Sequence, residues 1–225
     1  MRNGCILISS RIDAATTAAL VEQCNGAIVG REHDADEAPV ADELADKPVA
    51  WRFTSVIAKA PPEPAVWHPP RVSDAFERLL TAAGQQSALL ITLTEAALRE
   101  PGTEAKANGD FDLQEAYAVL TRHRFLIESF AVPVALHLPA LQAGGRLELI
   151  ADFLDEINSP YIGWGHELTI CDANAGTIAR LRDELAHRLF GFYLRTAMDR
   201  LHDAREVFAV RELLSPEVPL IVLPE

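Results

Sequence analysis

The chain has 225 residues, of which 49% are hydrophobic, and a formal net charge of −13. This length suits one large domain or two small ones with buried cores, and the apolar content excludes a disordered chain. The negative charge argues against general nucleic-acid binding, which requires a basic face.

No segment of the sequence points to a membrane or to secretion. There is no run of 18 apolar residues, so no membrane-spanning helix is expected. The start, MRNGCILISSRIDAA, has too short an apolar run for a signal peptide. Cys5, Cys24 and Cys171 are odd in number and far apart, unlike a disulfide framework or a zinc site. We therefore expect a cytoplasmic protein.

Strand-like and helix-like patterns alternate through the first half of the chain. Asp13 is a good N-cap for one helix, and VAWRFTSVIAKA alternates with the period of a strand. The acidic segment REHDADEAPVADELADK is interpreted as a solvated loop, and the alternative is a strip that binds a basic partner. In chain order the sequence predicts strand 5–10, helix 13–26, strand 27–30, acidic loop 31–47, strand 49–60, proline-rich loop 61–70, helix 71–84, strand 87–94 and polar loop 100–110.

The stretch from Asp110 to Cys171 has the clearest order in the chain. It predicts helix 112–130, strand 131–139, helix 146–157 and strand 165–172. Beyond it we expect mostly helix from about 174 to 205, although LFGFYL (189–194) is apolar nearly all round. The final segment, SPEVPLIVLPE, is interpreted as a terminal extended segment or an edge strand.

Alternating strands and helices indicate an α/β or an α+β protein. Several strands are short, alternating and separated by prolines, whereas strands of a buried parallel sheet are uniformly apolar. The pattern therefore favours the α+β class.

Standard catalytic motifs are absent from the sequence. There is no P-loop, dinucleotide-binding glycine pattern, nucleophile elbow, HExxH or CxxC, and no cofactor is predicted. His137, His166 and Asp172 lie in or next to neighbouring predicted strands and could converge on a metal ion, although nothing fixes their spacing locally. Cys171 is interpreted as a buried structural thiol.

Five motifs occur in an order that suggests a family: LTRHRFLIESF, VPVALHLPAL, LELIADFLDEI, IGWGHELTICD and GFYLR. Over about residues 110–200, this order resembles the gas vesicle accessory proteins of the GvpF/GvpL family. The resemblance implies a ferredoxin-like antiparallel sheet with helices in an N-terminal domain, 1–140. It implies a mainly helical α+β lobe for residues 141–225.

The resemblance also implies a function. The protein would be a non-enzymatic accessory protein of gas vesicle assembly, cytoplasmic and vesicle-associated. Its partners would be the hydrophobic shell protein or other accessory proteins, with no nucleic acid and no membrane span. Strand 131–139 and the LFGFYL segment are candidate surfaces for an apolar partner. The candidate partner-binding residues are Val134, Leu136, Leu138, Phe190, Phe192 and Tyr193.

Two alternatives stay open. One is a small α/β enzyme or metal-binding protein that uses His137, His166 and Asp172. The other is an acidic inhibitor or immunity-type binding protein, which rests only on the net charge of −13.

Overall fold

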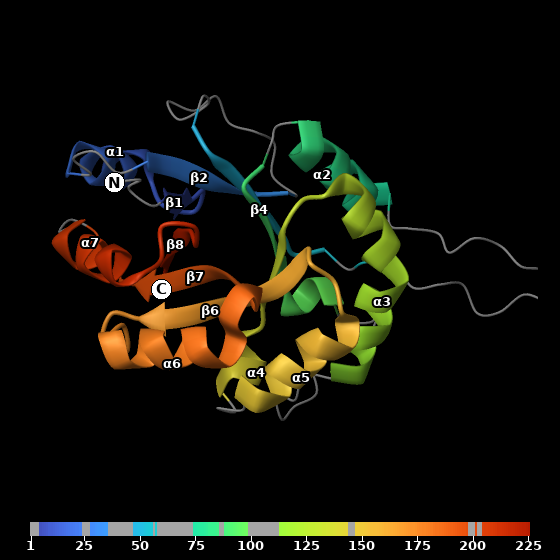
Figure 1. Cartoon of the computed structure of the whole chain (residues 1–225). Helices are drawn as coiled ribbons and strands as arrows, with labels where there is room; N and C mark the ends of the chain where they lie inside the picture. Colours follow the sequence, from blue (N-terminus) through green and yellow to red (C-terminus); the bar gives the residue numbers. More distant parts are fainter. Residues whose placement is uncertain are drawn as a thin grey trace, which may run out of the picture.

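Eight parallel strands close into a barrel in this computed structural model (Figure 1). Each strand pairs with the next along the chain, and β8 pairs with β1. The structure describes residues 5–23, 28–35, 47–55, 57, 74–85, 88–98, 113–143, 147–197, 201 and 204–225. The strands are β1 Cys5–Ser9, β2 Ile28–Asp34, β3 Val49–Phe53, β4 Leu90–Thr94, β5 Val134–His137, β6 Ile162–Thr169, β7 Leu189–Thr196 and β8 Leu220–Pro224.

Helices lie around the barrel, in the connection from β1 to β2 and in each connection from β3 onward (Figure 1). Parallel neighbours need such crossovers because their ends lie at opposite edges. The helices are α1 Ala14–Gln23, α2 Asp74–Gln85, α3 Leu113–Phe130, α4 Pro139–Ala143, α5 Leu147–Ile157, α6 Ala175–Leu185 and α7 Ala204–Leu213, with 3₁₀ turns at η1 Glu95–Leu98 and η2 Ala186–Arg188. Within the described residues, none of these helices has both the length and the apolar character to cross a membrane.

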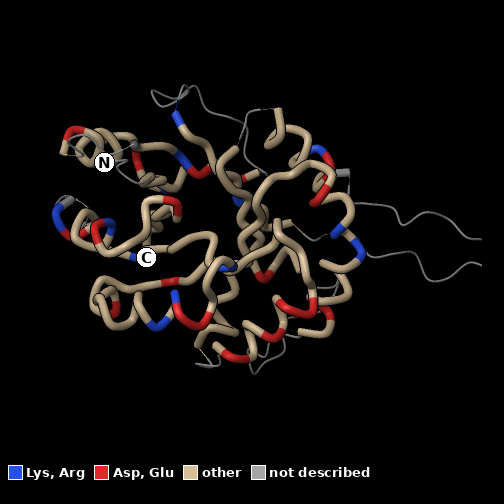
Figure 2. The backbone as a smooth tube through the Cα atoms, in the orientation of Figure 1, with Lys and Arg blue, Asp and Glu red and all other residues tan. Residues whose placement is uncertain are grey.

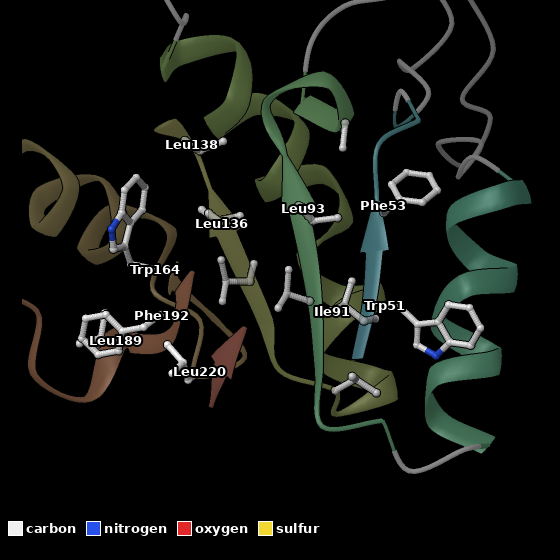
Figure 3. Close-up of a cluster of buried hydrophobic side chains, with 14 of the residues drawn as sticks. Trp51, Phe53, Ile91, Leu93, Leu136, Leu138, Trp164, Leu189, Phe192 and Leu220 are labelled. Atoms are coloured by element: carbon white, nitrogen blue, oxygen red, sulfur yellow. The ribbon is translucent and has the colours of Figure 1, made fainter. Parts of the chain in front are cut away.

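The larger hydrophobic core lies between the outer face of the barrel and the helices. Alternate residues of each strand point outward, and the apolar faces of the helices pack on them. Figure 3 shows part of this core, including Trp164 of β6, Leu136 of β5 and Ile91 of β4.

A second, smaller core fills the barrel itself. It consists of Leu7, Ala50, Leu90, Ala135, Tyr193, Ile221 and Leu223. Two glycines of β6 make room for the large side chains of β7: a Cβ on Gly165 would overlap the Tyr193 ring, and one on Gly163 would lie 2.5 Å from Cγ of Phe190. The barrel is therefore packed with side chains and is not a pore.

The expected fold class is wrong. The structure contains a closed parallel barrel, not a ferredoxin-like antiparallel sheet followed by a helical lobe. The alternation that favoured α+β arises because polar residues of several strands point into the barrel while apolar residues point out to the helices. The domain boundary expected at residue 140 falls between β5 and β6, which pair with each other in this one barrel.

A prediction near the C-terminus is also wrong: the segment LFGFYL belongs to strand β7, not to a helix. The terminal segment is extended, as expected, but it forms β8 and pairs on both sides within the closed barrel rather than lying at an edge. A parallel strand buried on both faces is apolar throughout, and periodicity alone does not separate it from a buried helix.

The remaining elements agree better with the sequence predictions. The helices expected at 112–130 and 146–157 are present as α3 and α5 within one residue at each end. The acidic segment begins inside β2, which extends to Asp34. The loops expected at 61–70 and 100–110 lie outside the described residues.

Candidate functional site

Polar side chains gather inside the barrel toward the carboxyl ends of six consecutive strands. Because the side chains of a strand alternate between its two faces, these residues point inward, in register with the inner apolar core. Most other charged residues lie on the helices and loops around the barrel (Figure 2). The inward polar residues are Glu32 of β2, Arg52 of β3, Thr92 of β4, His137 of β5, Glu167 of β6 and Arg195 of β7.

The deepest part of this group is the ion pair between Glu32 and Arg52. Arg52 Nε lies 3.0 Å from Glu32 Oε2, and both residues are buried. Thr92 donates its hydroxyl to Glu32 Oε1 at 2.8 Å and lies 2.7 Å from the hydroxyl oxygen of Tyr193. Burial raises the pKa of the Tyr193 hydroxyl, which therefore stays neutral. Each buried charge is thus paired and hydrogen-bonded, as its desolvation requires.

His137 links this deep pair to the mouth of the barrel. Its ring stacks on that of Tyr193, with centroids 4.2 Å apart. Its Nδ1 lies 3.3 Å from Arg52 Nη1, and its Nε2 lies 2.9 Å from Glu167 Oε2. Burial, together with the charge of Arg52, outweighs the hydrogen bond to Glu167 and lowers the pKa of His137, so the ring is neutral at pH 7.

Glu167 and Arg195 form the part of the group that solvent reaches. Two parallel hydrogen bonds of 2.9 Å join the Arg195 guanidinium to the Glu167 carboxylate. The Arg195 side chain is 38% exposed and that of Glu167 is 17% exposed. Burial alone would raise the pKa of Glu167, but the hydrogen bonds from His137 and Arg195 lower it to about 2. The carboxylate is therefore ionised at any physiological pH.

The backbone of Glu167 is held in place by Gln142 of α4. The Gln142 side chain accepts the Glu167 N–H at 2.7 Å and donates to the Glu167 carbonyl oxygen. This amide fills the position that a paired strand would otherwise take. It fixes Glu167 against the end of the strand that carries His137.

Solved structures share this architecture. A D-psicose 3-epimerase with D-tagatose from Clostridium cellulolyticum H10 is 10% identical, with a TM-score of 0.52, and the match covers 98% of this chain and 84% of that one. A D-psicose 3-epimerase in the presence of D-fructose is 11% identical, with a TM-score of 0.54 and the same coverage of 98% and 84%. No protein-family model and no curated protein matches the sequence. At these identities the likeness shows the barrel fold.

The barrel overturns the expected family and the function drawn from it. The resemblance to the GvpF/GvpL family is wrong, since the segments that carried it form strands and helices of a parallel barrel. The prediction of a non-enzymatic accessory protein is wrong as well, because it was drawn from a family resemblance that the parallel barrel contradicts. It had also rested on missing motifs, whereas sites in such barrels are assembled from separate strand ends that no local motif marks.

The predicted partner-binding residues are mostly interior. Val134, Leu136, Leu138 and Phe192 are buried in the core outside the barrel, and Tyr193 is buried within it. Phe190 is half-buried and lines a cavity of about 500 Å³ at the amino end of the barrel.

The three residues considered as metal ligands lie in different surroundings. His137 points into the barrel, whereas His166 packs outside it, where its Nδ1 accepts the Trp164 indole N–H at 3.2 Å. Asp172 is exposed and accepts a hydrogen bond from the Thr169 hydroxyl. In the part of the chain that the structure describes, no three His, Cys, Asp or Glu side chains are grouped to hold a metal ion.

Sequence reasoning found only one member of the inner polar group, His137. It missed the others because they come from five different strands and no local motif links them. A signal was present: a polar residue occurs in the last half of several otherwise apolar strands, as in LITLT, VALH and FYLRT. In a parallel barrel these positions meet at one rim. The missed residues are Glu32, Arg52, Thr92, Glu167 and Arg195.

Proposed function

We propose that the protein is an enzyme that moves a proton at a carbon next to the carbonyl of a small, uncharged, hydroxylated substrate such as a ketose. The observation that carries this proposal is the contact between His137, Glu167 and Arg195 at the carboxyl ends of β5, β6 and β7. Active sites of (βα)₈ barrels lie at this end.

Glu167 is the proton acceptor in this proposal. It is the only carboxylate of the inner group with a partly exposed side chain, since Glu32 is buried beneath Arg52 and Thr92. A pKa of about 2 makes the free carboxylate a weak base near neutral pH. A substrate oxygen that takes hydrogen bonds from Arg195 removes part of that stabilisation, so the pKa of Glu167 rises when substrate binds.

Arg195 supplies the complementary charge. When the C–H bond breaks, its proton passes to Glu167 and the electron pair delocalises onto the carbonyl oxygen. A guanidinium close to that oxygen stabilises the negative charge that develops there. The protonated Glu167 carboxyl exchanges its proton with water and returns a proton to carbon in the second half of the reaction, so atoms and charge balance without another reactant.

The charge balance of the site favours an uncharged substrate. Arg52 and Arg195 face Glu32 and Glu167, and at the rim Arg11 donates to Asp34 at 3.0 Å. Each cation is thus matched by a carboxylate, which leaves no net charge to attract an anion. Hydroxyl and carbonyl groups suit such a surface of fixed donors and acceptors. The epimerases with the same fold, which were solved with D-tagatose and D-fructose, support a sugar.

The test is proton exchange with solvent. The purified protein is incubated in D₂O with a panel of uncharged ketoses and aldoses and their phosphorylated counterparts. NMR then follows deuterium entering the carbon next to the carbonyl, as well as any new sugar. We expect exchange with at least one uncharged sugar. Exchange with only the phosphorylated compounds, or with none of the panel, would contradict the proposal.

Two variants locate the chemistry. Glu167→Gln removes the base and should slow exchange by about 10²–10⁴-fold. Glu184→Gln is the matched control, because Glu184 lies on α6 and pairs with Arg180 at the surface. The control should exchange at the wild-type rate. Equal rates for the two variants would rule out Glu167 as the base.

A further inference from the structure

Arg52 contacts His137 on the side of the ring opposite Glu167. Arg52 Nη1 lies 3.3 Å from His137 Nδ1, and Glu167 Oε2 lies 2.9 Å from His137 Nε2. A guanidinium remains protonated in proteins and has only donors to offer. His137 Nδ1 must therefore accept this hydrogen bond, and it carries no proton.

The second ring nitrogen then carries the proton. A neutral imidazole has one N–H, so an unprotonated Nδ1 requires a protonated Nε2. The partner of Nε2 is an ionised carboxylate, which only accepts hydrogen bonds. Both contacts thus require the same tautomer. A proton on Nδ1 would point at Nη1 of Arg52, where donor would meet donor.

Arg52 is itself held firmly. Glu32 accepts hydrogen bonds from Arg52 Nε at 3.0 Å and from Arg52 Nη2 at 3.4 Å. The centroid of the Tyr193 ring lies 5.4 Å from the guanidinium carbon of Arg52. Thr92 in turn fixes Glu32. Arg52 therefore presents Nη1 to His137 in one orientation, within a network in which every polar member has a partner.

We infer that Arg52 is a positioning residue that holds His137 as the neutral Nε2–H tautomer. His137 then acts as a hydrogen-bond donor, and Glu167 is left as the only base of the site. The role in catalysis rests on the proposed function, but the tautomer does not. Second residues that fix the tautomer and the ring of a functional histidine are common in protein sites.

The charged groups around the His137 ring shift its pKa in opposite directions. Burial and the charge of Arg52 disfavour the imidazolium, whereas Glu167 on β6 and Glu32 on β2 favour it. Removal of Arg52 together with Glu32 takes away one charge of each sign and the donor to Nδ1. Nδ1 is then free to take a proton, and the ring can titrate.

The tautomer is measured directly by long-range ¹H–¹⁵N correlation of protein labelled with ¹⁵N-histidine, and loss of signals in His137→Gln assigns the residue. In the wild type we expect Nε2–H and bare Nδ1 at pH 7 and at pH 8. An imidazolium or an Nδ1–H form at pH 7 would overturn the inference. This result depends on no variant other than the one used for assignment.

Variants then test the role of Arg52. Glu32→Gln/Arg52→Gln leaves no charge of this buried pair behind, and in it His137 should keep Nε2–H toward Glu167 and take up a second proton, on Nδ1, between pH 5 and 8. The control Arg195→Gln keeps the Arg52 contact and should keep the wild-type tautomer. If Nδ1 of His137 stays unprotonated over this whole pH range in the double variant, the inference is overturned.

The two proposals fail separately. If the wild type shows the Nε2–H tautomer but exchanges no substrate proton, the proposed reaction fails and the role of Arg52 stands. If exchange occurs but His137 is an imidazolium, the reaction stands and the positioning role fails. In the active enzyme, the pH profile of kcat/KM should lack a histidine ionisation near 6.5.

Discussion

The two ends of the barrel interior differ sharply in chemistry. At the amino end the interior is apolar, with Leu7, Leu90 and Ile221 in contact. At the carboxyl end it holds paired charges, such as Glu32 of β2 and Arg52 of β3. One end has only packing to offer. The other keeps ionised groups in fixed places, at a cost in desolvation that packing elsewhere has to offset.

The two ends of the barrel interior depend on different kinds of interaction. Hydrophobic burial is not directional, so the amino end tolerates changes that preserve volume. Hydrogen-bonded charges are directional, so the carboxyl end depends on each partner. Four measurements test this division.

The largest effect is expected at the polar end. Arg52→Met leaves the Glu32 carboxylate buried without its partner, and we expect the free energy of unfolding to fall by about 4 kcal/mol. Urea unfolding measures it. The double variant Glu32→Leu/Arg52→Met, which removes both charges, should recover most of the loss. If the double variant is as unstable as the single one, packing and not charge dominates this end.

At the amino end, Leu90→Ala tests packing alone. Leu90 is buried in the inner core, so a cavity should cost about 3 kcal/mol. Because no member of the polar group is removed, the rate of proton exchange should stay within about twofold of wild type when the protein is folded. A large loss of exchange with intact folding would show that the two ends are not independent.

Acid should lower the stability of the protein through His166, which packs outside the barrel, as well as through groups in the barrel interior. Burial is the main cause that lowers the pKa of His166 from 6.5 to about 4. Between these values the unfolded chain binds a proton that the folded protein excludes, so stability is complete above about pH 6.5 and falls toward pH 4. The part of this stability that is lost by pH 4 is roughly 3 kcal/mol.

The matched variant for this pH effect is His166→Gln. Its side-chain oxygen can still accept from Trp164, but it does not titrate. Urea unfolding at pH 7 and pH 4.5 should show a smaller loss in the variant than in the wild type. The pKa values of His137 and His123 are also lowered, so both histidines contribute to the loss that remains in the variant. An equal loss in both proteins would exclude His166 as a contributor.

The smallest effect on stability is expected at Tyr193, which belongs to the inner apolar core and also stacks on His137. Gly165→Ala places a methyl group against the Tyr193 ring, and overpacking of this kind costs about 2 kcal/mol. The ring that moves is the one stacked on His137, so exchange should fall too. Gly84→Ala is the control, since its added carbon would meet Phe130 at an ordinary 3.6 Å. Equal stability of the two variants would show that Tyr193 adjusts freely.

Local features of the fold could be predicted from the sequence, but its closure could not. The alternation of residues 49–53 correctly places Trp51 and Phe53 on one face and Arg52 on the other. The helix α5 could be predicted as well, because its apolar residues recur at helical spacing along the sequence. The parallel order of the strands depends on pairing between distant segments, such as β8 with β1. No local pattern encodes that pairing.

The site was hidden for the same reason. Glu167 follows His166 in a segment interpreted only as the start of a strand, and its partners Arg195 and His137 lie 28 and 30 residues away. In the LFGFYL segment, burial on both faces removed the alternation that would have predicted a strand. Without β7, the sequence offered no reason to bring Arg195 to Glu167.

The contact between Gln142 and Glu167 has a mechanical consequence. Gln142 lies five residues after His137 in the chain, and its side chain is hydrogen-bonded to both the N–H and the carbonyl oxygen of Glu167. The donor and the base are therefore joined twice, once through their side chains and once through the short helix α4. The position of the base relative to the donor therefore depends on α4 as well as on the contact between their two side chains.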